Sequence, residues 1–170
     1  MRNKTVRTFL IDGYNLLHLC TRRRLSAEEI QAKREELIWK LIGASAGKKV
    51  EFYVVFDGSG HFETMQAYPG VRVEFAPSAD ERIRRIIIER QEGRELVVVS
   101  SDRKDIGNFA VAHEVEWMTS QQFLKRLNEY STSKAQSNSD ADGKDHVPAG
   151  WKREYNDELL RIFTDSQREE

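Results

Sequence analysis

The sequence contains one cysteine, three prolines and no long apolar stretch. One cysteine cannot form an intramolecular disulfide framework or a cysteine-only zinc site. So few prolines, together with ten glycines in 170 residues, exclude collagen and a proline-rich scaffold. No apolar run approaches the roughly 18 residues that cross a bilayer, and Asp12, Asn15 and His18 interrupt the apolar segment near the N-terminus before it could form a signal-peptide core. We therefore expect a cytoplasmic protein that does not associate with membranes.

The charge of the whole chain is nearly balanced, but its distribution is uneven. The net charge is −1. From Ser131 onwards six basic and nine acidic residues give −3, whereas the first 130 residues hold 21 basic and 19 acidic residues and carry +2. Basic residues cluster within 22–24, 48–49 and 82–85. One cluster alone is typical of a solvated surface, whereas several clusters on one rim favour contact with phosphates.

Apolar runs alternate with amphipathic stretches through the first 130 residues. The runs predict strands at 8–11, 50–56, 71–75, 96–99 and 115–118. Helical spacing predicts helices at 26–42, from 78 onwards, at 106–112 and at 120–130, with a polar loop over 58–70. Strands that alternate with helices favour parallel β-α-β units with right-handed crossovers. We therefore predict an α/β fold, a three-layer α/β/α sandwich around a mainly parallel sheet.

The composition changes after residue 130. Residues 1–130 carry the predicted domain, and residues 131–150 are small and polar, which indicates a flexible linker. Residues 151–170 predict an amphipathic helix with apolar positions on one face: Trp151, Tyr155, Leu159, Ile162 and Phe163. We expect this helix to pack on its own domain or on a second copy, the alternative being a surface for a separate partner.

Aspartates follow the predicted strands. Asp12, Asp57 and Asp102 each come after a strongly apolar run, and Asp80 lies in the first turn of a predicted helix. The carboxyl ends of parallel strands lie along one edge of a sheet, where ligand crevices form. The four side chains should therefore meet at that edge, although they are far apart in the sequence.

Carboxylates that converge need a cation nearby. Like charges a few ångström apart repel and raise one another's pKa. Oxygen ligands without cysteine suit Mg²⁺ or Mn²⁺, and such an ion activates water and stabilises charge on a phosphoryl group. The chemistry that fits the pattern is metal-dependent phosphodiester hydrolysis.

Each acid also has a purely structural interpretation. Asp12-Gly13 and Asp57-Gly58 are good turn dipeptides. Asp102 could be a helix N-cap, and Asp80 suits the positive end of a helix dipole. These interpretations explain single residues, but they do not explain why each strong strand ends in aspartate.

Four other polar residues near these segments admit two interpretations. Asn15 either caps the helix after the first turn or orients Asp12. Glu81 is interpreted as the capping-box partner of Ser78. His18 and His61 are possible proton carriers, but we interpret both as ordinary surface histidines.

Four blocks, in order, resemble the YacP-like NYN-domain proteins, which belong with the PIN-like metal-dependent ribonucleases. The blocks are IDGYNLL at 11–17, VVFD at 54–57, SADE at 78–81 and VVSSDR at 98–103. The resemblance covers roughly residues 8–130. The loop after Asp57 has fewer lysines and glycines than that of many relatives, and we identify no counterpart for the segment after Ser131.

The resemblance implies a PIN-like fold and endonucleolytic cleavage of RNA. It implies Mg²⁺ or Mn²⁺ at four ligands, Asp12, Asp57, Asp80 and Asp102. Asn15 matches the family's asparagine after the first acid, and Glu81 matches its second acid in the helix block. Some members of the family act on ribosome-associated messenger RNA, which makes mRNA the expected substrate and the ribosome a candidate partner.

We therefore predict a metal-dependent endoribonuclease. The predicted catalytic residues are Asp12, Asn15, Asp80 and Asp102. The predicted RNA-binding residues are Arg82, Arg84, Arg85, Arg103 and Ser101, with Arg84 on the same helix face as Asp80. The alternative is a non-catalytic RNA- or ribosome-binding module with the same fold. A haloacid-dehalogenase-type phosphatase would need a second acid two residues after Asp12, where this chain has Tyr14, and no G-x-G-x-x-G loop is present.

Overall fold

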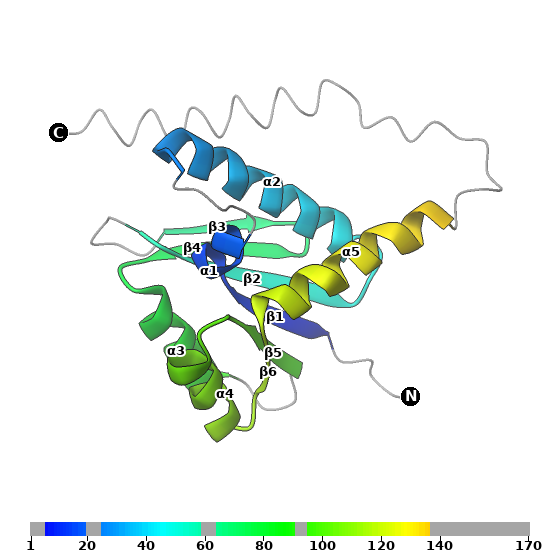
Figure 1. Ribbon diagram of the computed structural model, residues 1–170. Coiled ribbons are helices and arrows are strands. Elements are labelled where there is room, and N and C mark those ends of the chain that lie inside the picture. Colours follow the sequence, from blue (N-terminus) through cyan, green and yellow to red (C-terminus); the bar gives the residue numbers. More distant parts are fainter. Residues whose placement is uncertain (1–5, 20–24, 59–63, 91–94, 137–170) are drawn as a thin grey trace, which may run out of the picture. The chain divides into compact units, whose positions relative to one another are not determined.

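A six-stranded sheet forms the middle layer of the computed structural model, which describes residues 6–19, 25–58, 64–90 and 95–136 (Figure 1). The strand order is β3-β4-β2-β1-β5-β6. Only β3 runs antiparallel to its neighbour, β4, and every other pair is parallel. The strands are β1 (Arg7–Asp12), β2 (Val50–Asp57), β3 (Thr64–Tyr68), β4 (Val71–Ala76), β5 (Glu95–Val99) and β6 (Glu116–Met118).

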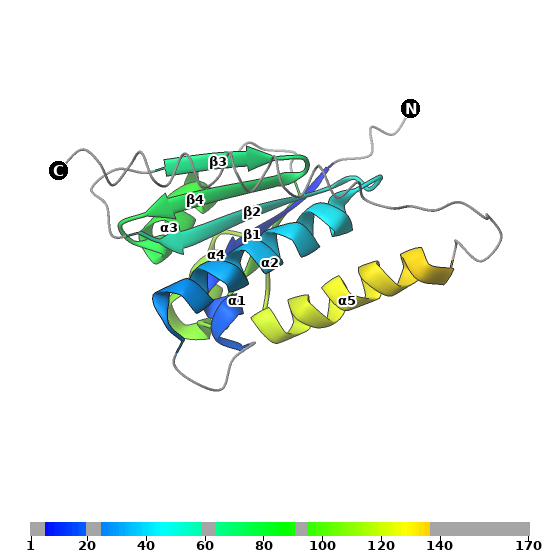
Figure 2. The same ribbon diagram turned by 90° about the horizontal axis from the view of Figure 1, so that it is seen from above.

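Helices cover both faces of the sheet. One face carries α1 (Gly13–Leu19), α2 (Ala27–Ser45) and α5 (Ser120–Gln136), and the other carries α3 (Ala79–Glu89), the π-helix η1 (Arg103–Gly107) and α4 (Asn108–Ala112) (Figures 1 and 2). We call these the α2 face and the α3 face. The arrangement confirms the predicted three-layer α/β/α fold.

The central strand is apolar on both sides because both faces of the sheet are covered. Phe9, Leu10 and Ile11 have no solvent exposure. Phe9 and Ile11 join the core on the α2 face, whereas Leu10 joins the core on the α3 face. A strand buried on both faces is typical of parallel sheets and explains why the sequence shows a continuous apolar run here.

The start of α2 is determined locally. The Ser26 hydroxyl accepts a hydrogen bond from the Glu29 backbone N–H, and the Glu29 carboxylate accepts one from the Ser26 N–H. This capping box confirms the predicted start. Such a cap contributes about 0.5–2 kcal/mol to the stability of a helix.

The segment 58–70 is not entirely a loop, as the sequence suggested. Its second half forms β3, which pairs with β4 in a hairpin through Pro69 and Gly70. Gly70 has φ +69°, and a Cβ there would lie 2.4 Å from the Ser45 hydroxyl oxygen, so this turn requires glycine. β3 is an edge strand with largely exposed side chains, which is why its sequence lacks a strong apolar signal.

Helices near the end of the described chain are longer than predicted. The helical segment expected at 106–112 begins at Arg103, as η1 followed by α4. α5 continues to Gln136, six residues into the expected linker, because no glycine or proline interrupts it before Gly143. The rest of that linker and the helix predicted for 151–170 lie outside the described residues, as do His61 and the basic cluster 22–24.

Among the helices of the described chain, none combines the length and the apolar character that crossing a bilayer requires.

Candidate active site

The four aspartates lie together at one edge of the sheet. Asp12 and Asp57 are the last residues of β1 and β2, Asp102 follows β5 by three residues, and Asp80 is the second residue of α3. Because β1, β2 and β5 are parallel, these strand ends point to the same edge. We call this group of four carboxylates the acidic edge.

The charges of the acidic edge affect one another. Burial raises the pKa of Asp12, and the charges of Asp80 and Asp57 raise it further. Burial likewise raises the pKa of Asp80, with further increases from the charges of Asp102 and Asp57. The side chains are therefore close enough to repel, as the position of the strand ends predicted.

Asn15 holds the most buried of these carboxylates. Asp12 is 7% exposed. Its two oxygens accept hydrogen bonds from the Asn15 backbone N–H at 3.0 Å and from the Asn15 side-chain amide at 3.3 Å. These bonds lower the pKa of Asp12 and partly offset the effect of burial. Asn15 therefore orients Asp12, one of the two roles that the sequence left open.

The same asparagine connects β1 to the chain after β5. Its Nδ2 lies 3.4 Å from the Ser100 hydroxyl oxygen, and its Oδ1 accepts a hydrogen bond from the Ser101 backbone N–H at 3.3 Å. The Ser100 hydroxyl also accepts from the Asp102 N–H at 3.1 Å. Ser100 is completely buried. Sequence reasoning selected Ser101 and missed Ser100, although the position of Ser100 directly after a buried strand could have indicated an inward side chain.

Asp57 and Asp102 each have a structural role in addition to their place at the edge. Asp57 Oδ1 accepts a hydrogen bond of 2.8 Å from the Ala79 backbone N–H, which fixes the start of α3. Asp102 Oδ1 accepts a hydrogen bond of 3.0 Å from the Asp105 N–H as the N-cap of η1. The structural interpretation of these two residues therefore applies, and it does not exclude a functional role for them at the edge.

Arg84 and Asp105 border Asp80. The Asp105 charge raises the pKa of Asp80, whereas the Arg84 guanidinium lowers it. Arg84 Nη2 lies 3.8 Å from Asp105 Oδ1, and its Cζ lies 5.6 Å from the Phe109 ring centroid. The prediction that Arg84 lies beside Asp80 agrees with this geometry. Asp105 was not selected from the sequence, because the π-helical turn that brings it to the edge has no sequence signal.

Arg82 does not lie in a position to bind RNA at the acidic edge. Its Nε is 2.5 Å from Glu74 Oε1, and its Nη2 is 3.4 Å from the Tyr53 hydroxyl. The Tyr53 hydroxyl also donates to Glu74. The Arg82 side chain is 15% exposed and Glu74 is 1% exposed. Arg82 is therefore part of a buried network, which we call the Glu74 network, and not a phosphate-binding candidate.

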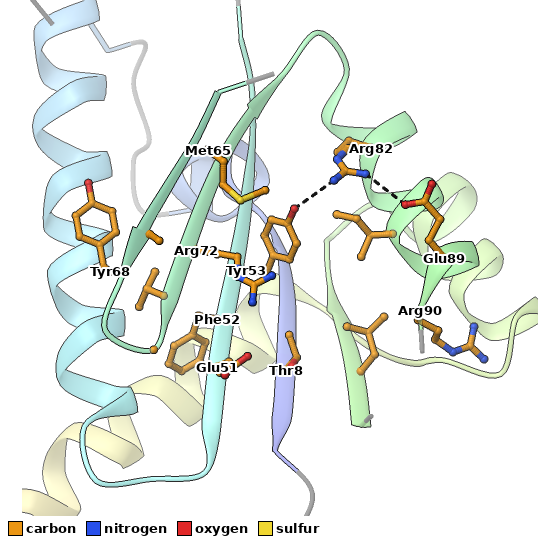
Figure 3. A pocket seen from close by; sticks show the side chains of 15 residues that line it. Thr8, Glu51, Phe52, Tyr53, Met65, Tyr68, Arg72, Arg82, Glu89 and Arg90 are labelled. Atoms are coloured by element: carbon orange, nitrogen blue, oxygen red, sulfur yellow. Dashed lines mark hydrogen bonds and ion pairs between the residues drawn. The ribbon is translucent and has the colours of Figure 1, made fainter. Parts of the chain in front are cut away.

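The Glu74 network borders a cavity on the α3 face. The cavity has a volume of about 690 Å³ and is lined by residues of α3 and of strands β1, β2, β3, β4 and β5. Tyr53 and Arg82 point toward one another at its wall (Figure 3). Burial and the hydrogen bond to Glu74 raise the pKa of Tyr53 to about 12, so this hydroxyl stays protonated. The prediction that Arg82 binds RNA is wrong because the sequence does not show that Glu74, on β4, faces α3 and binds this arginine.

The other predicted residues lie at the surface. Arg85 is exposed on α3, Arg103 is the exposed first residue of η1, and Ser101 is exposed next to Asn15. Their contact with RNA remains a prediction. The Glu81 backbone N–H donates to the Ser78 hydroxyl at 3.3 Å, as expected at a helix start, and His18 is exposed at the end of α1.

The donors of the acidic edge fit a hard divalent cation. Four carboxylates converge, and at two of them the charged form is disfavoured, so a cation would relieve the repulsion. In the described part of the chain, no three His, Cys, Asp or Glu side chains are already arranged as a metal site. The carboxylates therefore have the chemistry of a Mg²⁺ or Mn²⁺ site, while their oxygens are not arranged around a single point.

Comparison with known proteins gives matches to one family. A family model described as YacP-like NYN domain matches residues 9–165. The crystal structure of Rae1 (YacP) from Bacillus subtilis superimposes with a TM-score of 0.64 at 22% identity, over 95% of this chain and 95% of that chain. The crystal structure of a tryptophan-to-leucine variant of the same protein gives a TM-score of 0.60 at 19% identity, over 79% and 86% of the two chains. No curated protein matches significantly.

Proposed function

Because this chain belongs to the YacP-like NYN domain family, which has a PIN-like nuclease fold, we propose that it is a metal-dependent endoribonuclease that hydrolyses phosphodiester bonds in RNA. One observation carries the proposal. Asp12, Asp57, Asp80 and Asp102 come from distant parts of the sequence to one sheet edge, where burial and mutual repulsion raise the pKa of two of them. Acids whose pKa is raised by burial and by neighbouring charges, at the carboxyl edge of a parallel sheet, are candidates for an active site.

Divalent metals are the usual cofactors of this nuclease family, and the acidic edge is where we place one. Asp12, Asp80 and Asp102 would hold Mg²⁺ or Mn²⁺, and Asp57 would support them. A divalent cation bound there supplies an acidified water and stabilises the negative charge that develops on the phosphoryl group.

The residues around the acids have positioning roles in the proposed reaction. Asn15 keeps both Asp12 oxygens in a fixed orientation, and its bonds to Ser100 and Ser101 keep β1 in register with the segment that bears Asp102. Asp57 sets the position of Asp80 through the start of α3. Arg84, Arg85 and Arg103, together with Ser101, would bind the phosphates that flank the cleaved bond.

Messenger RNA is the substrate that we propose, and the ribosome is a candidate partner. Support for both is that some members of the family act on ribosome-associated messenger RNA. A messenger RNA substrate would place the enzyme in the cytoplasm.

The test is cleavage of a labelled single-stranded RNA by the full chain with Mg²⁺ or Mn²⁺. We expect Asp12→Asn and Asp80→Asn each to reduce the cleavage rate by at least about a hundredfold, since both remove a ligand charge. Glu95→Gln, a carboxylate change at the opposite end of β5, should leave the rate unchanged. Circular dichroism should confirm that all three variants are folded.

The same assay separates the alternative. If the wild-type chain binds RNA but cleaves none with any divalent ion, the protein is a non-catalytic RNA-binding module. Cleavage by Asp12→Asn and Asp80→Asn at the wild-type rate would also contradict the proposal.

A further inference from the structure

An arginine on the α2 face lies beside the acidic edge and was not expected there from the sequence. Arg34 belongs to α2, and its Cζ lies 5.2 Å from the Phe75 ring centroid and 5.8 Å from that of Phe56. Phe56 and Phe75 pair across β2 and β4, and each is the next-to-last residue of its strand. Asp57 directly follows Phe56. The guanidinium therefore lies over the ends of β2 and β4, and β2 ends in Asp57 of the acidic edge.

The charge of Arg34 is not neutralised by the acids nearest to it on α2. Glu36 forms ion pairs with Lys33 at 2.6 Å and with Lys40 at 2.7 Å, and Glu35 accepts a hydrogen bond from Gln31. Among the described residues, Arg34 itself forms no ion pair with a carboxylate. Its planar group rests on two aromatic rings, which holds it in place while its N–H donors remain available for a bidentate contact.

Aromatic rings continue from Arg34 toward Asp12. Tyr14, two residues after Asp12, is half-buried, and its ring meets Phe56 edge to face at a centroid distance of 5.2 Å. His18, one turn later and exposed, lies 6.3 Å from the Tyr14 ring. We call Tyr14, His18, Arg34 and Phe75 the α2-side strip. A basic group interleaved with aromatic rings is the usual surface for nucleic-acid strands whose bases are unpaired.

The acidic edge therefore has an arginine on each face of the sheet. Arg84, on α3, lies close enough to Asp80 to lower its pKa, and Arg34, on α2, lies over Phe56 near the end of β2. The helices α3 and α2 that carry these two arginines cover opposite faces of the sheet (Figure 1). A polyanion can approach four carboxylates only if cations bind its phosphates on both sides of the bond that reacts. If only one face carried an arginine, the RNA on the other side of the reacting bond would lie against a negative surface.

We propose that Arg34 binds a backbone phosphate of the substrate and that the RNA strand crosses the acidic edge from Arg84 on the α3 face to Arg34 on the α2 face, with one base stacked on Tyr14. This inference rests on the proposed function. It adds the path of the strand and two binding residues, Arg34 and Tyr14, that lie outside the basic cluster on α3.

The test measures binding of a fluorescent single-stranded RNA by anisotropy in the Asp80→Asn background, so that no cleavage occurs, at several salt concentrations with Mg²⁺ present. We expect Arg34→Gln to weaken binding about tenfold at low salt and to lower the slope of log K against log salt by about 0.7, the value of one phosphate contact. Arg34→Lys should keep most of the slope. If Arg34→Gln has a lower thermal midpoint, Arg34→Met replaces it, since that side chain preserves packing on Phe75.

Arg72 provides a matched control. Its Cζ lies 5.7 Å from the Tyr53 ring, in the same stacked arrangement, but near the other end of β4. Arg72→Gln should leave both the affinity and the salt slope unchanged. For the stacked base, Tyr14→Leu should weaken binding at least about fivefold, whereas Tyr14→Phe should not.

Four outcomes decide the matter. If Arg34→Gln and Arg72→Gln give the same affinity and slope, Arg34 binds no phosphate and the inference is overturned. If Tyr14→Leu binds like Tyr14→Phe, the stacking contact is overturned. If the wild-type chain cleaves RNA and either of these results is found, only this inference is contradicted. If the wild-type chain neither binds nor cleaves RNA, the proposed function is contradicted as well.

Discussion

Two carboxylates of the described chain, Glu74 and Asp12, are buried, and they have opposite surroundings. Glu74 is 1% exposed and is bound by the Arg82 guanidinium and the Tyr53 hydroxyl. Asp12 is 7% exposed, receives hydrogen bonds from Asn15 alone among the described residues, and faces other carboxylates. One acid has a cation of its own, and the other has like charges as neighbours.

The difference indicates what each group does. A buried charge is tolerated in a fold when it is paired and hydrogen-bonded, as Glu74 is. Carboxylates that repel one another lower stability, and they persist in proteins chiefly where a ligand or a reaction requires them. The Glu74 network therefore holds α3 on the sheet, whereas the repulsion at the acidic edge supports our proposal that this edge is the functional part.

The largest effect is expected from breaking the Glu74 network. Glu74→Ala removes the nearest partner of Arg82 and leaves it only the Tyr53 hydroxyl at 3.4 Å and the exposed Glu89 at 3.8 Å. We therefore expect the free energy of unfolding to fall by about 3–5 kcal/mol, measured by urea denaturation. The control is Asp105→Ala, which removes an exposed ion pair of 3.8 Å between η1 and Arg84 of α3 and should cost less than about 0.5 kcal/mol. Equal losses for the two variants would mean that burial does not distinguish them.

A divalent cation should supply the acidic edge with the counter-charge that it lacks. At a concentration of about 100 times its Kd, Mg²⁺ or Mn²⁺ should raise the free energy of unfolding by about 2.7 kcal/mol. Asp80→Asn should lose most of this gain, whereas Glu95→Gln should keep it. Thermal unfolding with and without the ion measures both, and an equal gain in Asp80→Asn would place the cation elsewhere.

The smallest effect, and one of opposite sign, is expected for Asp80→Asn without metal. Because folding raises the pKa of Asp80, its ionised form lowers stability at pH values above that pKa, and the cost vanishes below its unfolded value of about 3.9. The variant should therefore be more stable than the wild type by about 0.5 kcal/mol at pH 7, a small figure because Asp80 is partly solvated and screened. It should show no gain at pH 3.5. Urea denaturation at both pH values checks the sign, and a destabilised variant at pH 7 would contradict the repulsion.

The sequence was sufficient to predict the layers of the fold and the meeting of the four aspartates. Both depend on short-range patterns, since apolar runs mark the parallel strands and the acids follow those runs directly. Once β1, β2 and β5 are parallel, the positions of Asp12, Asp57 and Asp102 at one edge follow without further information.

Other features depend on contacts that no local pattern specifies. Arg82 and Arg84 have the same chemistry and lie two residues apart, yet one points to Glu74 and the other to the acidic edge. β3 is held by its pairing with β4 rather than by its own apolar content. Ser100 and Arg34 become relevant only through Asn15 and through the phenylalanines at the strand ends.

The place of β1 in the middle of the sheet has a consequence for motion at the acidic edge. Its amides are bonded between β2 and β5 and shielded on both faces, so they should exchange with deuterated solvent only when the whole domain unfolds. Asp12 is thus carried by the slowest-exchanging part of the chain. If the domain opens locally to admit a strand of RNA, the surrounding helices should move, whereas the backbone that carries Asp12 should not.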